Sequence, residues 1–325
     1  MNSVAPVTGQ RKWTHALPSP IRDLFRPLLH AWQHFYDISR GKWRIYQSRR
    51  REEKVDATQH RAILAHATPI VQDVGGVRFV LYPFDEPNLL ELARHPADVA
   101  EFGAIPRLVR AGDVAFDVGA NIGFYSVLLS RLCGLSGRVW AFEPVPDTYW
   151  RLRETLALNR CDNVSPVQAA VCDRQGDVRM NLFDPQHAEW NSMGVPVMDG
   201  RGATKASPSR SITVPACTLD EFCDSEKIER INFLKVDVEG FEMSVFAGAK
   251  RLLQEHRVDY ICFEISRNPL KAAGFEARNV FETLETYGYF SYALEKTTGR
   301  FSGPLHDTSE DWTNFFASVT NLTRH

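Results

Sequence analysis

Continuous apolar runs of strand length alternate with helical patterns from Val114 onward. After the run that starts there, others lie at 138–142, 164–171, 231–236 and 258–265. Strands of a parallel sheet covered by helices on both faces read as such runs, because neither face meets water. The residues between runs show helical spacing of apolar side chains, as at Ile122, Tyr125, Leu128, Leu129 and Leu132. The alternation predicts an α/β fold with a parallel, doubly wound sheet and right-handed crossovers.

Weaker patterns predict the remaining elements: extended pieces at 178–183 and 211–215, helices at 147–159 and near 278–287, and strands near 289–294 and at 314–318. Asp147 is expected to be the N-cap of its helix. Thr218 and Glu221 have the spacing of a capping box that opens a short helix. Residues 184–210 lack any period, and a loop this long inside a domain is usually functional.

The N-terminal part carries a different pattern. We expect a partly disordered, partly helical extension (1–70), a lead-in segment (71–112) with a strand at 77–82 and a helix at 86–110, and a main domain (113–325). Residues 1–60 hold 11 Lys/Arg against 5 Asp/Glu, although the net charge of the whole chain is −2. An apolar stripe predicts a helix within 20–53 that packs on the main domain or on a partner chain. A peripheral contact with an anionic membrane surface is the alternative.

A polar turn follows the first apolar run. It reads Asp117-Val-Gly-Ala-Asn-Ile-Gly123, and the next run ends on Glu143. Glycines allow close approach of the backbone, and an acid at the end of the second strand suits ribose hydroxyls. The turn lacks both the Gly-x-Gly-x-x-Gly fingerprint and a phosphate loop. These features predict a nucleoside cofactor without phosphate, and S-adenosylmethionine, with its positive ammonium and sulfonium groups, fits.

Composition limits the class of protein, its partners and its cellular location. The hydrophobic fraction is 44% and the charged fraction 24%, which are ordinary values for a globular protein. The small, locally basic segment and the acidic remainder predict no nucleic-acid partner. Six cysteines without a Cys-x-x-Cys pair favour reduced thiols and a cytoplasmic location. We find no secretory signal at the start and no apolar stretch long enough to cross a bilayer.

Several motifs in order resemble those of the FkbM-type family of S-adenosylmethionine-dependent methyltransferases, a class I group. They are the turn 117–123, Phe142-Glu-Pro144, Asp173, Lys235-Val-Asp-Val-Glu-Gly240 and Glu264. The resemblance covers roughly residues 77 to 318. It implies a Rossmann-like, seven-stranded sheet whose last strand is antiparallel. It also implies O-methylation, often of a hydroxyl on a sugar or a small metabolite.

The expected cofactor-binding residues lie at the carboxyl ends of the strands: Asp117, Gly119, Asn121, Gly123, Glu143, Pro144 and Asp173. Asp117 and Gly119 would face the methionyl part, and Glu143 the ribose. Asn121 would orient the cofactor or cap the following helix, and Asp173 would contact adenine or form a plain turn. We expect Glu143→Ala to weaken cofactor binding with little change in thermal stability.

The candidate catalytic bases are Asp237, Glu239 and His187. Lys235 lies in a buried strand and is expected to neighbour an acid such as Asp237, because a buried charge needs a partner. That pairing is also a purely structural explanation of both residues, and Glu239 could instead cap a helix. No metal is predicted. Mg²⁺ bound by Asp237, Glu264 and Asn268 is an alternative that only their common crevice supports.

Two other functional classes stay open at this point. A nicotinamide-dependent oxidoreductase or epimerase shares the acid at the end of the second strand but needs the missing glycine pattern. A catalytically silent module could keep the cofactor site without turnover. The sequence does not specify the acceptor or the oligomeric state.

Overall fold

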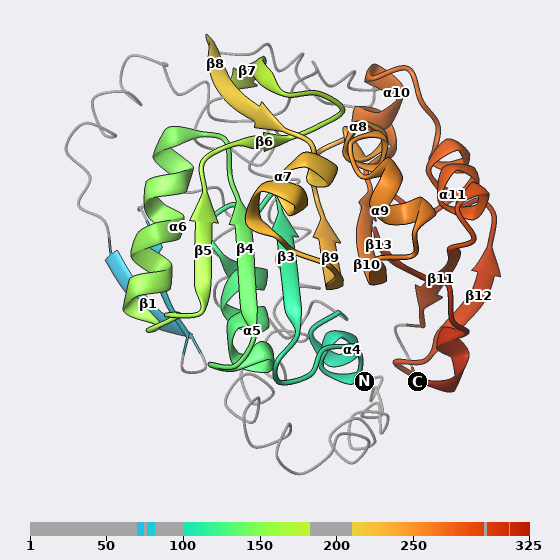
Figure 1. Cartoon of the computed structure of the whole chain (residues 1–325), viewed down its shortest axis with the longest axis horizontal. Helices are drawn as coiled ribbons and strands as arrows, with labels where there is room; N and C mark the ends of the chain where they lie inside the picture. The colour runs from blue at the N-terminus through green and yellow to red at the C-terminus, as the bar shows by residue number, and fades with distance from the viewer. Residues whose placement is uncertain (1–69, 75–76, 82–100, 183–209, 296–297, 312) are drawn as a thin grey trace, which may run out of the picture.

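The computed structural model describes residues 70–74, 77–81, 101–182, 210–295, 298–311 and 313–325 (Figure 1). The predicted helix within 20–53, His187 and the loop up to residue 209 lie outside these ranges, as does most of the helix expected at 86–110.

One sheet forms the centre of the described structure, with the strand order β12-β11-β13-β10-β9-β3-β4-β5 (Figure 1). The bounds are β3 Val114–Val118, β4 Arg138–Phe142, β5 Val164–Val167, β9 Ile231–Val236, β10 Val258–Ile265, β11 Phe290–Leu294, β12 Phe301–Leu305 and β13 Thr313–Ser318. The five strands from β10 to β5 are mutually parallel, and β13 is antiparallel to β10. The α/β class, the parallel core and the antiparallel last strand are therefore confirmed.

The expectation of seven strands is wrong by one. The sheet has eight, because β12 pairs antiparallel with β11 and becomes the outer strand. Its sequence, Phe-Ser-Gly-Pro-Leu, contains a glycine and a proline. Both residues weaken a strand pattern, and proline is tolerated at sheet edges, where no partner needs its missing N–H.

Helices cover both faces of the sheet. On one face, α4 (Glu101–Leu108), α5 (Phe124–Cys133) and α6 (Pro146–Leu158) pack on side chains such as Ala115, Val139 and Ala141. On the other face, α7 (Leu219–Glu226), α8 (Glu242–Ala247), α9 (Lys250–Gln254), α10 (Arg267–Ala272) and α11 (Ala277–Thr286) enclose the larger core around Phe116, Leu234 and Phe263. The N-cap of α6 is Val145, with Pro146 in the first turn, so the prediction of Asp147 as N-cap is wrong.

A second, three-stranded sheet has the order β6-β8-β7 and comprises β6 Ala170–Val171, β7 Gly176–Leu182 and β8 Arg210–Cys217. It confirms the extended pieces predicted at 178–183 and 211–215. Figure 1 shows it at the end of the molecule toward which β3, β4 and β5 point. Val145, directly after β4, belongs to its apolar core, so this sheet is anchored beside the carboxyl ends of the parallel strands.

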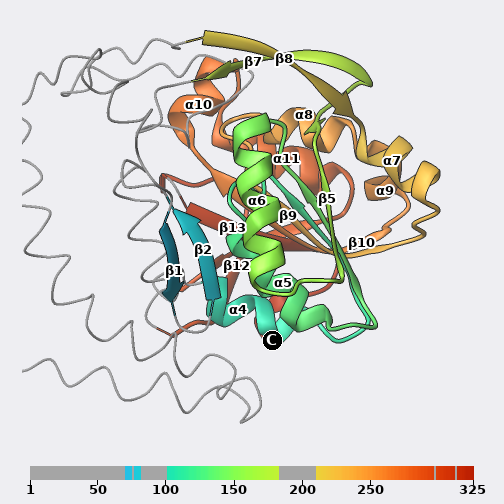
Figure 2. The same cartoon turned by 90° about the vertical axis from the view of Figure 1, so that its left-hand side faces the viewer.

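The lead-in segment forms a hairpin of β1 (Ile70–Val74) and β2 (Val77–Leu81), of which only β2 was expected. Figure 2 shows the hairpin beside α6. The Arg78 amide donates to Asn159 Oδ1 at 2.9 Å, and Asn159 Nδ2 returns a bond to the Arg78 carbonyl at 2.5 Å. The Arg78 guanidinium also donates to the Leu158 carbonyl. The hairpin is thus fastened to the carboxyl end of α6.

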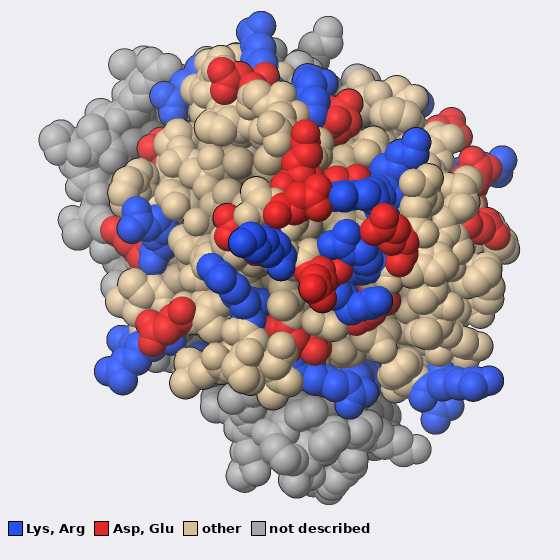
Figure 3. All heavy atoms as spheres, in the orientation of Figure 1, with Lys and Arg blue, Asp and Glu red and all other residues tan. Residues whose placement is uncertain are grey.

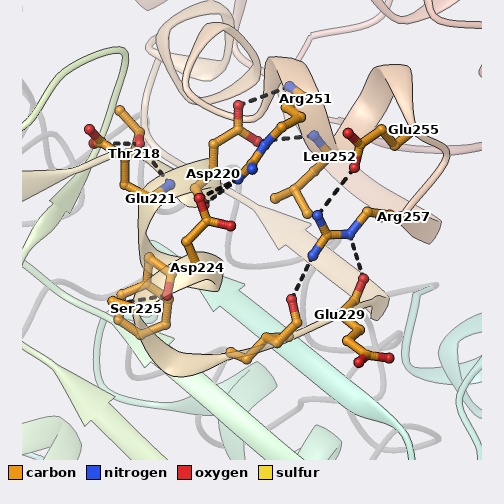
Figure 4. Close-up of polar contacts among 12 residues, drawn as sticks. Thr218, Asp220, Glu221, Asp224, Ser225, Glu229, Arg251, Leu252, Glu255 and Arg257 are labelled. Carbon is orange, nitrogen blue, oxygen red and sulfur yellow. Dashed lines mark hydrogen bonds and ion pairs between the residues drawn. The ribbon is translucent and has the colours of Figure 1, made fainter.

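Polar contacts join α7 to α9 on the outer side (Figure 4). Thr218 Oγ1 accepts from the Glu221 amide at 3.1 Å, which confirms the predicted helix start. Asp220 accepts from the amides of Arg251 and Leu252 at 2.8 and 3.0 Å, so one carboxylate caps the first turn of α9. Basic and acidic side chains are intermixed over this face (Figure 3), as expected for a solvated surface.

Within the part of the chain that the structure describes, no helix combines the length and the apolar character that a membrane span requires. All six cysteines are free thiols, and all except the half-buried Cys217 are buried.

Candidate functional site

The strand order reverses between β3 and β9. From β3 the chain moves outward through β4 to β5, and it returns to the other side of β3 as β9. In open α/β sheets, ligands bind at the carboxyl ends of the strands where this reversal occurs. Asp117, Glu143, Asp237 and Glu264 lie at these ends and affect one another electrostatically, so the structure brings the four acids together as predicted.

The turns after β3 and β9 are in direct contact. The Asp237 amide donates to the Val118 carbonyl at 3.0 Å, while the amides of Gly119 and Ala120 donate to the Phe142 carbonyl. Gly119 has a φ of 82°, and a Cβ at this position would lie 1.8 Å from the Asp237 carbonyl oxygen. Glycine is therefore required here by a neighbouring backbone, whatever ligand the turn holds.

The Glu143 side chain joins the turn after β3 to the start of α6. Its Oε2 accepts from the Asn121 amide at 3.1 Å and its Oε1 from the Val145 amide at 2.9 Å. Pro144, which has no N–H, lies between Glu143 and Val145. Burial raises the pKa of Glu143 to about 7, although these two amides oppose the shift. Since a carboxylate offers about four acceptor sites, it retains capacity for two ligand hydroxyls.

Asn121 and Gly123 shape the turn through their backbones. Both have positive φ, 48° and 98° respectively. The N-cap of α5 is Gly123, with no side-chain cap hydrogen bond, so the alternative role of Asn121 as a helix cap is wrong. A Cβ on Gly123 would lie 2.9 Å from Leu152 Cδ1, so this glycine also lets α5 begin close to α6.

Asp117 is buried on the same face of the sheet as α5. Its Oδ2 accepts from the Ser126 hydroxyl at 2.6 Å. Burial raises the pKa of Asp117 to about 6, while Ser126 and the charge of Lys235 oppose the shift. A buried acid that is partly protonated near neutral pH gains most from a cationic ligand, which would favour its ionised form.

Lys235 is completely buried, and the prediction that it neighbours Asp237 is confirmed. Its Nζ donates to Asp237 Oδ2 at 3.1 Å and to Asn314 Oδ1 at 2.9 Å, and it lies 4.8 Å from the centre of the Tyr125 ring. Burial lowers the pKa of Lys235, but the nearby acids raise it more, so the net shift is upward. The ammonium is thus held charged, and the side chain of Asp237 stays 27% exposed beside it.

Two further acids lie next to this pair. Ser266 donates to Glu264 Oε1 at 2.8 Å, and burial followed by the charge of Asp237 holds the pKa of Glu264 well above its usual range. In the turn after β9, Glu242 Oε1 accepts from the Gly240 amide at 3.1 Å. Glu239 is half-buried in this turn with a φ of 51°, and its role as a base stays a prediction.

Asp173 lies farther along the chain, after β6. Its carboxylate accepts from the Ser244 hydroxyl at 3.2 Å and pairs with Arg174 at 3.3 Å, while its amide donates to Ser244. These contacts describe a turn fastened to α8. The contact of Asp173 with adenine stays a prediction, and His187 lies outside the described residues.

Sequence reasoning missed Tyr125, Asn314 and Glu242. Tyr125 was read as one of the apolar positions of its helix, and Asn314 lies 79 residues from the lysine that it contacts. Only the position of Glu242, two residues after the Glu-Gly turn, could have indicated its role. Among the described residues no group of three or more His, Cys, Asp or Glu side chains is arranged to hold a metal ion.

The sheet has this doubly wound order and carries buried acids at the carboxyl ends of β3 and β4, the arrangement expected of a methyltransferase that uses S-adenosylmethionine. The chain belongs to the FkbM methyltransferase family, because the model described as "Methyltransferase FkbM domain" matches residues 117–291. Of the classes considered from the sequence, the methyltransferase enzyme is the one confirmed, rather than the oxidoreductase or the silent module.

Two curated relatives and one solved structure illustrate the similarity. The hexuronic acid methyltransferase AglP of Haloferax volcanii is 29% identical over 219 residues, 67% of this chain and 80% of its own. The 2-O-methyltransferase NoeI of Sinorhizobium fredii is 26% identical over 185 residues, 55% and 74% of the two chains. A methyltransferase structure from Aquifex aeolicus has a TM-score of 0.39 at 14% identity, covering 73% and 95%.

Proposed function

We propose that this enzyme methylates a hydroxyl group of a sugar or a sugar-containing metabolite. The names of the two relatives, a hexuronic acid methyltransferase and a 2-O-methyltransferase, support the choice of acceptor. The observation that carries the proposal is Asp237, a partly exposed carboxylate bound to a buried lysine at the reversal of strand order. A carboxylate paired with a fixed ammonium at this place is suited to take a proton from a hydroxyl.

The buried acids support the following arrangement of the cofactor. Glu143 accepts hydrogen bonds from the ribose hydroxyls, and Asp117 and the Gly119 turn face the positively charged methionyl part. Asn121, Gly123 and Pro144 hold the backbone of this cradle, and Asp173 lies toward the adenine. When bound, S-adenosylmethionine supplies a methyl carbon already activated by the positive sulfur. The protein's remaining task is to align the acceptor and remove its proton.

Asp237 is the base in this proposal, because Lys235 neutralises its charge while leaving part of the side chain accessible. Glu239 and His187 are the other candidates named from the sequence, and the same experiment tests them.

The test is transfer of labelled methyl from S-adenosylmethionine to a panel of monosaccharides, uronic acids and oligosaccharides. Asp237→Asn is expected to lower kcat by about 10²–10⁴-fold, the usual contribution of a placed base, while cofactor binding measured by calorimetry stays intact. Asp177→Asn, a substitution of an exposed residue in β7, is the matched control and keeps full activity. Normal turnover by Asp237→Asn would remove the base assignment and direct attention to Glu239→Gln and His187→Ala.

A further inference from the structure

We propose that Glu264 is a positioning residue that keeps one proton and donates it in a hydrogen bond to Asp237, the base of the proposed methyl transfer. The inference rests on the proposed function and adds a second acid to the site. It assigns different protonation states to two carboxyl groups that the sequence does not distinguish.

The placement of the two acids favours a shared proton. β10 runs parallel to β9 with Phe263 beside Val236, so the residues that follow them, Glu264 and Asp237, are neighbours at the carboxyl ends of the two strands. Two ionised carboxylates have no donor between them, so a hydrogen bond between these neighbours needs a proton on one of the two. Ser266 donates to Glu264 Oε1 at 2.8 Å, which leaves the second oxygen of this carboxyl group for Asp237.

The contact of the Lys235 ammonium with Asp237 determines which of the two acids, Asp237 or Glu264, carries the negative charge. The Lys235 Nζ lies 3.1 Å from Asp237 Oδ2, so the negative charge is most stable on Asp237. The charged and titratable groups that interact with this pair come from several elements: Asp117 on β3, Tyr125 on α5, Lys235 on β9, Glu242 on α8 and Cys262 on β10. Burial and the charge of Asp237 both raise the pKa of Glu264, in agreement with a neutral Glu264.

With Asp237 as the base and Glu264 protonated throughout, every proton in the reaction is accounted for. As the acceptor oxygen formed its bond to the methyl carbon, the bond from that carbon to sulfur would break and S-adenosylhomocysteine would leave, while the hydroxyl proton passed to the carboxylate of Asp237. The proton of Glu264 stays where it is, so the pair then holds two protons. Asp237, which is 27% exposed, returns its proton to solvent, and the starting state is restored. Glu264 touches no reacting atom and acts through Asp237.

The inference is tested by replacing each acid in turn by its amide, as Glu264→Gln and Asp237→Asn, in the whole 325-residue chain. A glutamine at 264 accepts from Ser266 and donates to Asp237, as a protonated glutamate does. Glu264→Gln is therefore expected to keep kcat within about threefold of wild type, whereas Glu264→Ala loses a donor to a charged group and about tenfold or more in kcat. Asp237→Asn, which cannot accept a proton, is expected to show the larger loss of about 10²–10⁴-fold in kcat.

The pH profile separates positioning from mere stability. In Glu264→Ala, the acid limb of kcat/KM is expected to move to higher pH, because the ionised base has lost a hydrogen-bond donor. In Glu264→Gln it stays in place. A structural defect alone would lower both variants without moving this limb. Calorimetric binding of S-adenosylhomocysteine at wild-type affinity shows that each variant is folded.

Two results overturn the inference. An active Asp237→Asn with an inactive Glu264→Gln would place the proton on Asp237 and make Glu264 the base. A Glu264→Gln as inactive as Glu264→Ala would show that Glu264 must ionise. Failure of the proposed function is distinct from both, because wild-type enzyme would then transfer no methyl group to any carbohydrate in the panel.

Discussion

The backbone of Gly119 lies against the carbonyl oxygen of Asp237, so the turn proposed to hold the cofactor and the turn that carries the proposed base form one packed unit. A Cβ on Gly119 would approach that oxygen to 1.8 Å. Positions in the two turns cannot change independently, because the Asp237 amide also donates to Val118 at 3.0 Å.

Gly119→Ala is expected to destabilise the fold and to weaken cofactor binding. Overpacking typically costs about 1–3 kcal/mol, and an alanine at positive φ adds roughly 1–2 kcal/mol. Chemical denaturation and calorimetry measure the two effects. Gly274→Ala is the matched control, since Gly274 has a φ of 87° and no atom within 4 Å of its Cβ position. Equal losses of unfolding free energy and cofactor affinity in both variants would show that the close approach to the Asp237 carbonyl has no effect of its own.

Glu143→Ala is expected to weaken cofactor binding by about ten- to a hundredfold, the value of a hydrogen bond to a charged group. The structure revises the expected stability, however, because the variant leaves the amides of Asn121 and Val145 without their acceptor. Each unpaired buried donor costs about 1–3 kcal/mol, so the melting temperature should fall as well. Calorimetry with S-adenosylhomocysteine and thermal unfolding check both; an unchanged dissociation constant would remove the ribose role.

Glu242→Gln is expected to remove part of the pH dependence of stability. Glu242 is completely buried, its Oε2 has no hydrogen-bond partner, and burial raises its pKa to about 7 from 4.5. A raised pKa in the folded state gives stability that is present at low pH and is lost as pH rises through about 7. The shift corresponds to a loss on the order of 3 kcal/mol above pH 7.

Urea unfolding at a series of pH values from 5 to 8 measures this effect. The unfolding free energy of Glu242→Gln should gain on that of wild type as the pH rises, because the amide cannot ionise. Parallel curves for the two proteins would show that Glu242 titrates in the same range whether the chain is folded or unfolded.

The sequence predicts the central sheet well because its signals are local. The runs before Asp117 and Glu143 indicate parallel strands, and the acids that end them indicate the ligand edge. The sequence does not predict the edge strand β12, because Gly303 and Pro304 interrupt the pattern of strand-forming residues. The contact of Asn314 with Lys235 joins strands far apart in the sequence, and no local pattern encodes it. Gly119 was expected to make room for a ligand, whereas its conformation first serves a neighbouring backbone.

β13, the last strand that the structure describes, lies inside the sheet between β10 and β11. Until residues 313–318 have been synthesised, the edges of β10 and β11 that face β13 therefore have no strand to pair with. The buried ammonium of Lys235 also lacks Asn314 until then. A chain truncated before residue 313 would therefore lack both the strand that joins β10 to β11 and one acceptor of the Lys235 ammonium.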